Sequence, residues 1–207
     1  MFKVVRMSKR ADKLPAEFRV DWLERHKELR RTASKLVASV AADGKPLGDD
    51  ASYDGVSALY FTTTGEARVA QGKAEKGVIS VVADEKVLFE KPQAVIKASN
   101  QLKVMLTAVR KPELTAAQFK DAALKGYAKA ESKAMMGAGI LKVVASFAVP
   151  EEKSPPFDSM LEIYFPGTDE LKAAFASPVI GMLRKDEETL ARLDAPEIRI
   201  VAEEFAL

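Results

Sequence analysis

The chain has 207 residues, 47% hydrophobic and 30% charged, which is the balance of a globular protein. Its net charge of +2 comes from 32 basic and 30 acidic side chains, so the composition does not favour a nucleic-acid partner. It has no cysteine, which excludes disulfides, a thiolate nucleophile and cysteine-ligated metals.

The sequence repeats itself, since residues 2–100 match residues 102–207 from end to end. We therefore expect two units, 1–100 and 101–207, each large enough to bury a core. Positions that are alike in both copies should build the fold, and positions that diverge should mark function. The matched segments include Phe2–Val5 with Leu102–Met105, Asp54–Phe61 with Asp158–Phe165, and Pro92–Ile96 with Pro196–Ile200.

Each copy opens with an alternating run, residues 2–8 and 102–109, which predicts a strand. A helical stripe follows in each copy. The stripe comprises Leu14, Phe18, Trp22, His26 and Leu29 in the first copy, and Leu114, Phe119, Ala123, Tyr127 and Ala130 in the second. Further strands are predicted at 34–42, 54–62 and about 92–98, and at 140–149, 158–165 and about 196–204, with shorter helices beginning near Gly65 and Thr168.

The element order β-α-β-β-α-β predicts an α+β protein made of two ferredoxin-like units. The junction at 97–101 is too short and polar for a flexible linker, so the units should share an interface. Helices cover only one face of each sheet, and two sheets packed face to face would cover the other. We expect an intramolecular dimeric α/β barrel, and leave open whether two chains associate further into a homodimer.

The N-terminus lacks the apolar core of a secretory signal, and no apolar run approaches the ~20 residues that span a bilayer. We therefore expect a cytoplasmic protein with no membrane partner.

The first helix carries Asp21–His26, and the third strand carries Asp54 and Tyr60-Phe61. This arrangement resembles the EthD-like proteins of the dimeric α/β-barrel superfamily, and the resemblance covers both copies. It implies a small-molecule pocket between sheet and helices. Members and relatives include lyases, isomerases, decarboxylases and oxygenases that often need no cofactor. The second copy departs from the pattern, with Ala123 for Trp22 and Tyr127 for His26.

His26, the only histidine, is the candidate catalytic residue. Its stripe position directs it toward the sheet, where an imidazole can accept or deliver a proton near neutral pH. The competing interpretation is a buried structural histidine bonded to a carbonyl. Trp22, the only tryptophan, either forms a pocket wall that stacks on a flat substrate or packs in the core.

Arg6 and Tyr60 are the other candidate substrate-binding residues. Arg6 matches Leu106, and an arginine in a half-buried sheet needs an anion. That anion is either a substrate carboxylate or Glu162, which has no acidic counterpart in the first copy. Tyr60 matches Tyr164, so a scaffold role competes with one in orienting a substrate.

These residues predict a cofactor-independent lyase or isomerase acting on a small, aromatic or cyclic, organic acid or ketone. Its pocket should lie in the first repeat, lined by Trp22 and His26. The alternative is a non-catalytic small-molecule binding or accessory protein. A single histidine excludes His-x-x-x-His zinc sites, so no metal is expected. No cofactor is expected either, with one alternative kept open: some α/β-barrel relatives bind haem, for which His26 would be the axial ligand.

Overall fold

The computed structural model describes residues 1–48, 51–92, 102–130 and 132–207. The first half contains β1 (Phe2–Ser8), α1 (Pro15–Leu29), a 3-10 turn η1 (Arg30–Thr32), β2 (Lys35–Ala41), β3 (Gly55–Phe61), α2 (Thr64–Gln71) and β4 (Ile79–Glu90). The second half contains β5 (Leu102–Ala108), α3 (Ala116–Tyr127), α4 (Ser132–Gly137), β6 (Lys142–Ala148), β7 (Ser159–Phe165), α5 (Thr168–Ala176), α6 (Val179–Leu190) and β8 (Arg199–Ala206).

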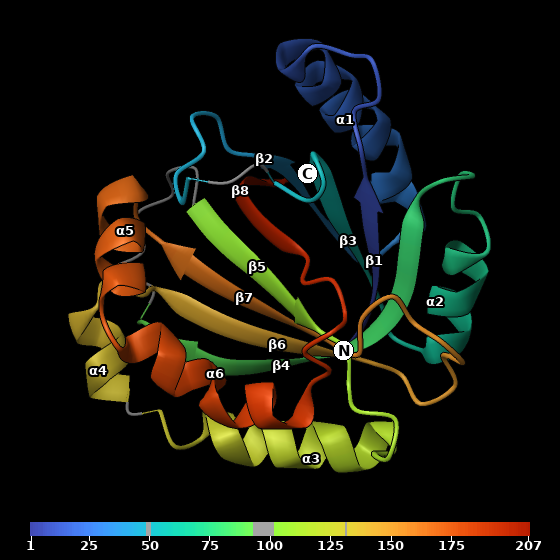
Figure 1. Cartoon of the computed structure of the whole chain (residues 1–207). Coiled ribbons are helices and arrows are strands. Elements are labelled where there is room, and N and C mark those ends of the chain that lie inside the picture. Colours follow the sequence, from blue (N-terminus) through green and yellow to red (C-terminus); the bar gives the residue numbers. More distant parts are fainter. Residues whose placement is uncertain (49–50, 93–101, 131) are drawn as a thin grey trace.

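The strands close into one barrel in the order β1-β3-β2-β8-β5-β7-β6-β4. Each half contributes four neighbouring strands, and the halves join where β2 pairs with β8 and β4 pairs with β6. The helices lie outside the barrel, α1 and α2 beside the first half and α3 to α6 beside the second (Figure 1). The predicted α+β fold, with two β-α-β-β-α-β units forming one barrel, is confirmed. The predicted junction at 97–101 lies outside the described residues.

The fourth strand of the first half differs from the prediction. It runs over Ile79–Glu90, whereas the sequence predicted a strand at about 92–98, most of which lies outside the described residues. The register places Val82 opposite the middle of β1, as it places Val201 opposite the middle of β5. The predicted alignment of the fourth strands is therefore wrong. The alignment failed because the second copy carries α6 before its last strand, and the described first half has no counterpart of that helix.

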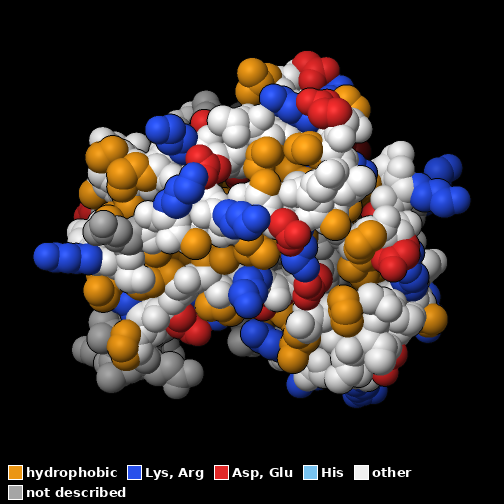
Figure 2. Space-filling model, turned by 90° about the horizontal axis from the view of Figure 1, so that it is seen from below, with side chains coloured by type: hydrophobic (Ala, Val, Ile, Leu, Met, Phe, Trp, Pro, Cys, Tyr) orange, Lys and Arg blue, Asp and Glu red, His pale blue; other side chains and the backbone are white. Residues whose placement is uncertain are grey.

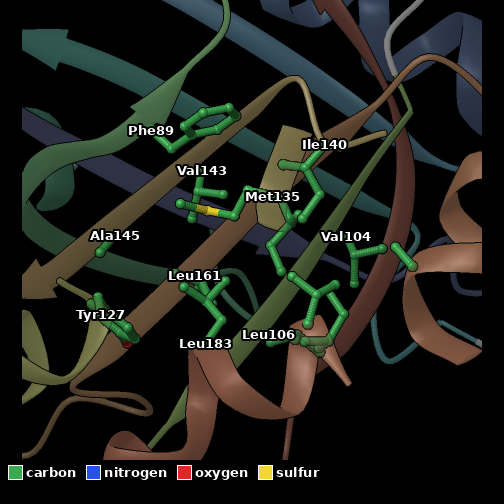
Figure 3. Packing of buried hydrophobic residues seen from close by; sticks show 14 of the residues in the cluster. Phe89, Val104, Leu106, Tyr127, Met135, Ile140, Val143, Ala145, Leu161 and Leu183 are labelled. Carbon is green, nitrogen blue, oxygen red and sulfur yellow. The ribbon is translucent and has the colours of Figure 1, made fainter. Parts of the chain in front are cut away.

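Alternation along each strand divides the side chains between an outer face and the barrel interior. On the outer face of the first half, Val4 and Leu59 pack against Phe18 and Trp22 of α1. Figure 3 shows the matching core of the second half, where Tyr127 of α3, Met135 of α4 and Leu183 of α6 lie over the strands. One part of the interior is apolar and includes Val5, Met7, Met105 and Met160.

The other part of the interior is charged and is organised around Glu162. This carboxylate accepts hydrogen bonds from two buried lysines, at 2.5 Å from Lys3 Nζ and 2.8 Å from Lys103 Nζ. Each lysine binds one further carboxylate at 2.9 Å, Glu85 for Lys3 and Glu204 for Lys103. Burial by itself would lower the pKa of both lysines, but attraction to the carboxylates raises it. Burial works against ionised Glu162 too, yet the two lysines lower its pKa. All three groups are therefore charged at neutral pH.

The outer surface carries both signs of charge. On the face shown in Figure 2, Lys and Arg side chains lie intermixed with Asp and Glu, and apolar side chains are scattered among them. Within the described part of the chain, no helix combines the length and the apolar character needed to cross a membrane.

Replacing Glu162 with glutamine should lower the free energy of unfolding by about 3–5 kcal/mol, because two buried lysines lose their shared counter-charge. Urea unfolding at pH 7 measures the change. Glu204→Gln is the matched control, because Glu204 binds one of the two lysines and is partly exposed, so its loss should cost less than half as much. Equal losses in the two variants would contradict a central role for Glu162.

Candidate functional site

Helix α1 presents an aromatic face to the sheet. Its first turn is held by Glu17, whose Oε2 accepts the backbone N–H of Leu14 at 3.2 Å. Phe18, Trp22 and His26 follow at helical spacing and are buried. The Phe18 and Trp22 rings stack with centroids 5.4 Å apart, and the Trp22 and His26 rings lie 4.1 Å apart. The predicted stripe thus fixes His26 at the end of a row of rings.

His26 is a neutral, buried base. Only 2% of the residue is exposed, and its Nδ1 lies 2.6 Å from the carbonyl oxygen of Trp22. A carbonyl only accepts, so Nδ1 carries the proton and the lone pair of the neutral ring is on Nε2. Burial lowers the pKa of His26 to about 4, the Trp22 carbonyl opposes this, and the positive charges of Arg6 and Arg25 add to it. At neutral pH the ring is therefore uncharged, so it can act as a general base but not, as an imidazolium would, as a general acid.

Arg6 lies on the outer face of β1, between Ser57 of β3 and Ser80 of β4 in the strand register. Its Nη2 donates to the carbonyl oxygen of Ala70 on α2 at 2.6 Å, and its Nε has no partner. Among the described residues, no carboxylate lies within ion-pairing distance of this guanidinium. The predicted alternative that pairs Arg6 with Glu162 is wrong, because that carboxylate lies inside the barrel with the two lysines.

Buried polar atoms without partners gather near Arg6. In the described part of the chain they include Arg6 Nε and the Oγ atoms of Ser57 and Ser80, which flank Arg6 in the strand register. Buried polar groups are normally paired, so this group indicates a place for water or a ligand. The two serines were not among the predicted site residues, because only the strand register brings them to either side of Arg6.

A cavity of about 540 Å³ opens between the outer face of the sheet, the end of α1 and α2. Arg6 lines it, together with apolar side chains from Leu29, Phe61, Val69 and Ala70. The cavity lies in the first half, between sheet and helices, where the sequence predicted the principal pocket.

The structure separates the residues that were expected to share one pocket. Trp22 borders a different hollow of about 200 Å³ beside Lys9 and Asp21, and a groove of about 790 Å³ lies between α1, the loop after β2 and β8. His26 borders none of these three cavities. Arg6 is therefore accessible from the 540 Å³ cavity, whereas the imidazole of His26 does not line it.

No metal or haem ligand set emerges from these residues. The described part of the chain contains no group of three or more His, Asp or Glu side chains placed to hold a metal ion. The imidazole of His26 is closed off from the cavities, so its present position does not fit an axial ligand of a porphyrin.

Tyr60 lies on the opposite face of the sheet from the other three predicted residues. It pairs with Lys3 in the strand register, and its hydroxyl donates to Glu85 at 2.9 Å inside the barrel. Burial raises the pKa of Tyr60, and the negative charges of Glu162 and Glu85 raise it further. The sheet itself stands between this hydroxyl and His26.

The second half fills the region that is open in the first. At the position of His26, Tyr127 donates to Glu187 of α6 at 2.6 Å, and Ser159 donates to the same carboxylate at 2.5 Å. Helix α6 packs along α3, whereas no described helix of the first half packs along α1 in this way (Figure 1). The divergence between the copies is thus a difference between a covered and an open outer face.

Comparison with known proteins supports the fold and goes no further. No protein-family model matches the chain, and no curated protein matches its sequence. An anthrone oxidase-like protein superposes with a TM-score of 0.65 at 7% identity, covering 99% of this chain and 92% of its own. A proposed monooxygenase from Lactobacillus acidophilus (TM-score 0.53, 10% identity, 100% and 98% covered) and a mutant chlorite dismutase from Candidatus Nitrospira defluvii (0.53, 11%, 98% and 90%) are also similar. The chain therefore shares a dimeric α/β-barrel fold with these proteins.

The stability of the protein should depend on pH through His26. The unfolded chain takes up a proton here near pH 6.5, whereas the folded protein resists protonation down to about pH 4. The contribution of neutral His26 to the free energy of unfolding is fully present above pH 6.5. It decreases by on the order of 3 kcal/mol as the pH falls toward 4. His26→Asn, whose amide can still donate to the Trp22 carbonyl, should remove that part of the slope. Urea titrations between pH 4 and 7 measure it, and an unchanged slope in the variant would refute the assignment.

Gly55→Ala should destabilise the protein by about 1–3 kcal/mol. The added Cβ would lie 2.7 Å from the Trp22 ring and 2.8 Å from the Phe18 ring. The second half carries the opposite combination, Ser159 on the strand and Ala123 on the helix. In a Trp22→Ala background the cost of Gly55→Ala should fall by more than half, as a double-mutant cycle of unfolding free energies can test. Simple additivity would show that the ring is not the obstacle.

Proposed function

We propose that this protein is an EthD-like enzyme that acts on a small, aromatic or cyclic, organic acid or ketone as a cofactor-independent lyase or isomerase. One observation carries the proposal: a neutral imidazole lies within electrostatic range of Arg6, a guanidinium without an ion pair that lines a cavity of mixed apolar and polar character. Leu106 and Tyr127 replace this pair in the second half, so the fold does not require it.

The proposed chemistry is proton removal from carbon. Nε2 of His26, which holds the free lone pair, would take the proton from a carbon beside a carbonyl group. The negative charge that develops on the carbonyl oxygen, which for an organic acid is an oxygen of its carboxyl group, would be stabilised by Arg6. Return of the proton to another carbon completes an isomerisation, and loss of a leaving group completes a lyase reaction.

The low pKa of His26 in the empty protein is compatible with this role. Burial and the charge of Arg6 both disfavour the protonated ring. Negative charge arising beside Arg6 during the reaction would offset that cation and raise the basicity of the imidazole as the proton moves. The base would thus be strengthened when the substrate anion forms.

Access to His26 would come from a movement of α1. This helix packs mainly on β2, and among the described residues it has no helix neighbour like the one that α6 provides for α3. An outward shift would therefore break fewer contacts here than in the second half. The cavity already exposes Leu29, one turn beyond His26.

Oxidation is the second candidate. The likeness in fold to an anthrone oxidase-like protein and to a proposed monooxygenase favours it. The carbanion formed by the same proton removal can react with dioxygen, so both candidates share the first step. Oxygen consumption during turnover, followed with an electrode, separates them.

His26→Ala should lower turnover by about 10²–10⁴-fold while the protein stays folded, because a general base is lost. The assay uses a substrate found by screening aromatic and cyclic acids and ketones. Tyr127→Phe is the matched control in the second copy, since it alters the equivalent helix position far from the proposed site, and it should change turnover by less than about threefold.

Both variants must be compared at equal folded fraction, because loss of a buried ring by itself costs stability. A folded His26→Ala protein with full turnover would contradict a catalytic role for His26. A non-catalytic binding protein would then explain the site better than an enzyme that uses this histidine.

A further inference from the structure

We propose that the cleft of the first half recognises its ligand through a carboxylate, with Arg6 as counter-ion and the hydroxyls of Ser57 and Ser80 beside it. The inference rests on the proposed function for the place where the ligand binds. It adds the class of ligand, namely a small organic acid with an apolar body the size of one or two rings, and excludes a neutral ketone.

Among the described residues no carboxylate forms an ion pair with Arg6; Glu75 attracts it from farther away and is itself paired with Arg25. The one hydrogen bond of Arg6 to protein is to the carbonyl oxygen of Ala70, at 2.6 Å. By contrast, the partly buried Arg110 has its Nε 3.0 Å from the carboxylate of Asp158. A buried guanidinium without a counter-charge is costly, so its presence favours an anion that comes from outside. Burial also lowers the pKa of Arg6, and the attraction of Glu75 opposes this only in part.

The unpaired atoms near Arg6 are donors. Ser57 and Ser80 stand opposite Arg6 on the two neighbouring strands, where Cβ atoms of facing residues are about 4.5–5.5 Å apart. Their hydroxyls lack partners, as does Nε of Arg6. Arg6 lines the cavity, whereas the two serines flank it on the sheet without lining the cavity themselves. The Arg6 nitrogen can only donate, and a carboxylate offers about four lone-pair sites to receive such bonds. This set fits an anion better than a neutral or cationic group.

The cavity suits an apolar body attached to that carboxylate. Its volume of about 540 Å³ falls within the range of small-molecule sites. Its wall carries Leu29, Phe61 and Val69, and its polar positions include Arg31, Lys73 and Glu66. The basic side chains outnumber the acidic one, so the electrostatic balance of the cleft also favours an incoming acid.

The second half serves as an internal comparison. Leu106 and Leu161 occupy the strand positions that Arg6 and Ser57 occupy in the first half. Both leucines lie in the core beneath the helices. Since the barrel closes equally well with apolar residues there, the polar pair of the first half is not a requirement of the fold.

Binding of defined acids tests the inference. Benzoate, salicylate and cyclohexanecarboxylate are titrated against the full chain by calorimetry and thermal shift, beside the matched neutral amides. The acids should bind at least about tenfold more tightly than their amides, and Arg6→Leu should weaken acid binding by more than about thirtyfold. Lys172→Leu removes the same formal charge from an exposed position of α5 in the second half, outside the cavity, and should weaken binding by less than about threefold.

The ligand-free Arg6→Leu protein supplies a second readout. It should melt at the same temperature as the parent or higher, since an unpaired buried charge is replaced by the residue of the second copy. A structural arginine would instead leave a less stable protein. The inference is overturned if amides bind as well as acids, if Arg6→Leu keeps its affinity, or if no acid shifts the melting temperature at about 10 mM.

The outcomes also separate this inference from the proposed function. If acids bind through Arg6 but are not turned over, the carboxylate site is supported and the proposed enzymatic function is contradicted. If a neutral ketone is turned over and the Arg6→Leu protein retains that activity, the enzymatic function is supported and the carboxylate site is contradicted.

Discussion

The bridge from Glu162 to Lys3 and Lys103 is the constraint on which the barrel depends. Both copies place a lysine at the same position of their first strand, and closing the barrel buries the two cations close together. A carboxylate between them turns repulsion into attraction, and the raised pKa values of the lysines show that attraction outweighs burial. In the first copy, the residue equivalent to Glu162 is Ala58. A symmetric dimer would have two carboxylates there or none, whereas a duplicated chain can place one.

The same freedom to diverge explains the outer faces. Gly55 leaves room for the large Trp22 ring in the first half, and Ser159 takes that room beside the small Ala123 in the second. In the second half the helix face is then sealed by α6, whose Glu187 collects two buried hydroxyl groups. In the first half the face keeps an open cavity. Duplication thus allows one copy to serve as scaffold while the other keeps unpaired polar groups that a lone domain would have to bury.

The architecture could be predicted from the sequence because the repeat, the strand periodicity and the short junction all point to the same barrel. The fourth strand of the first half was missed because aligning Pro92 with Pro196 did not allow for the greater length of the second copy before its last strand. The placement of Tyr60 could not be deduced without the pairing register of β1 and β3. Tyr60 is paired with Lys3 on the neighbouring strand, so both side chains point into the barrel. Arg6, three positions after Lys3, points outward by alternation, and that parity alone separates it from Glu162.

Ser57 and Ser80 were beyond the reach of the sequence for a related reason. A serine in a strand is ordinary, and only the register brings these two to either side of Arg6. The interior of the barrel offers a ligand little room in the described structure, because apolar side chains fill one part and the lysine–carboxylate bridge fills the other. The proposed recognition site therefore lies on the outer face. On that face the strands of the two halves are arranged alike, and the halves differ in the helices that cover them, which leave a cleft in the first half. The chemistry of this barrel thus depends on what lies over the sheet, more than on the sheet itself.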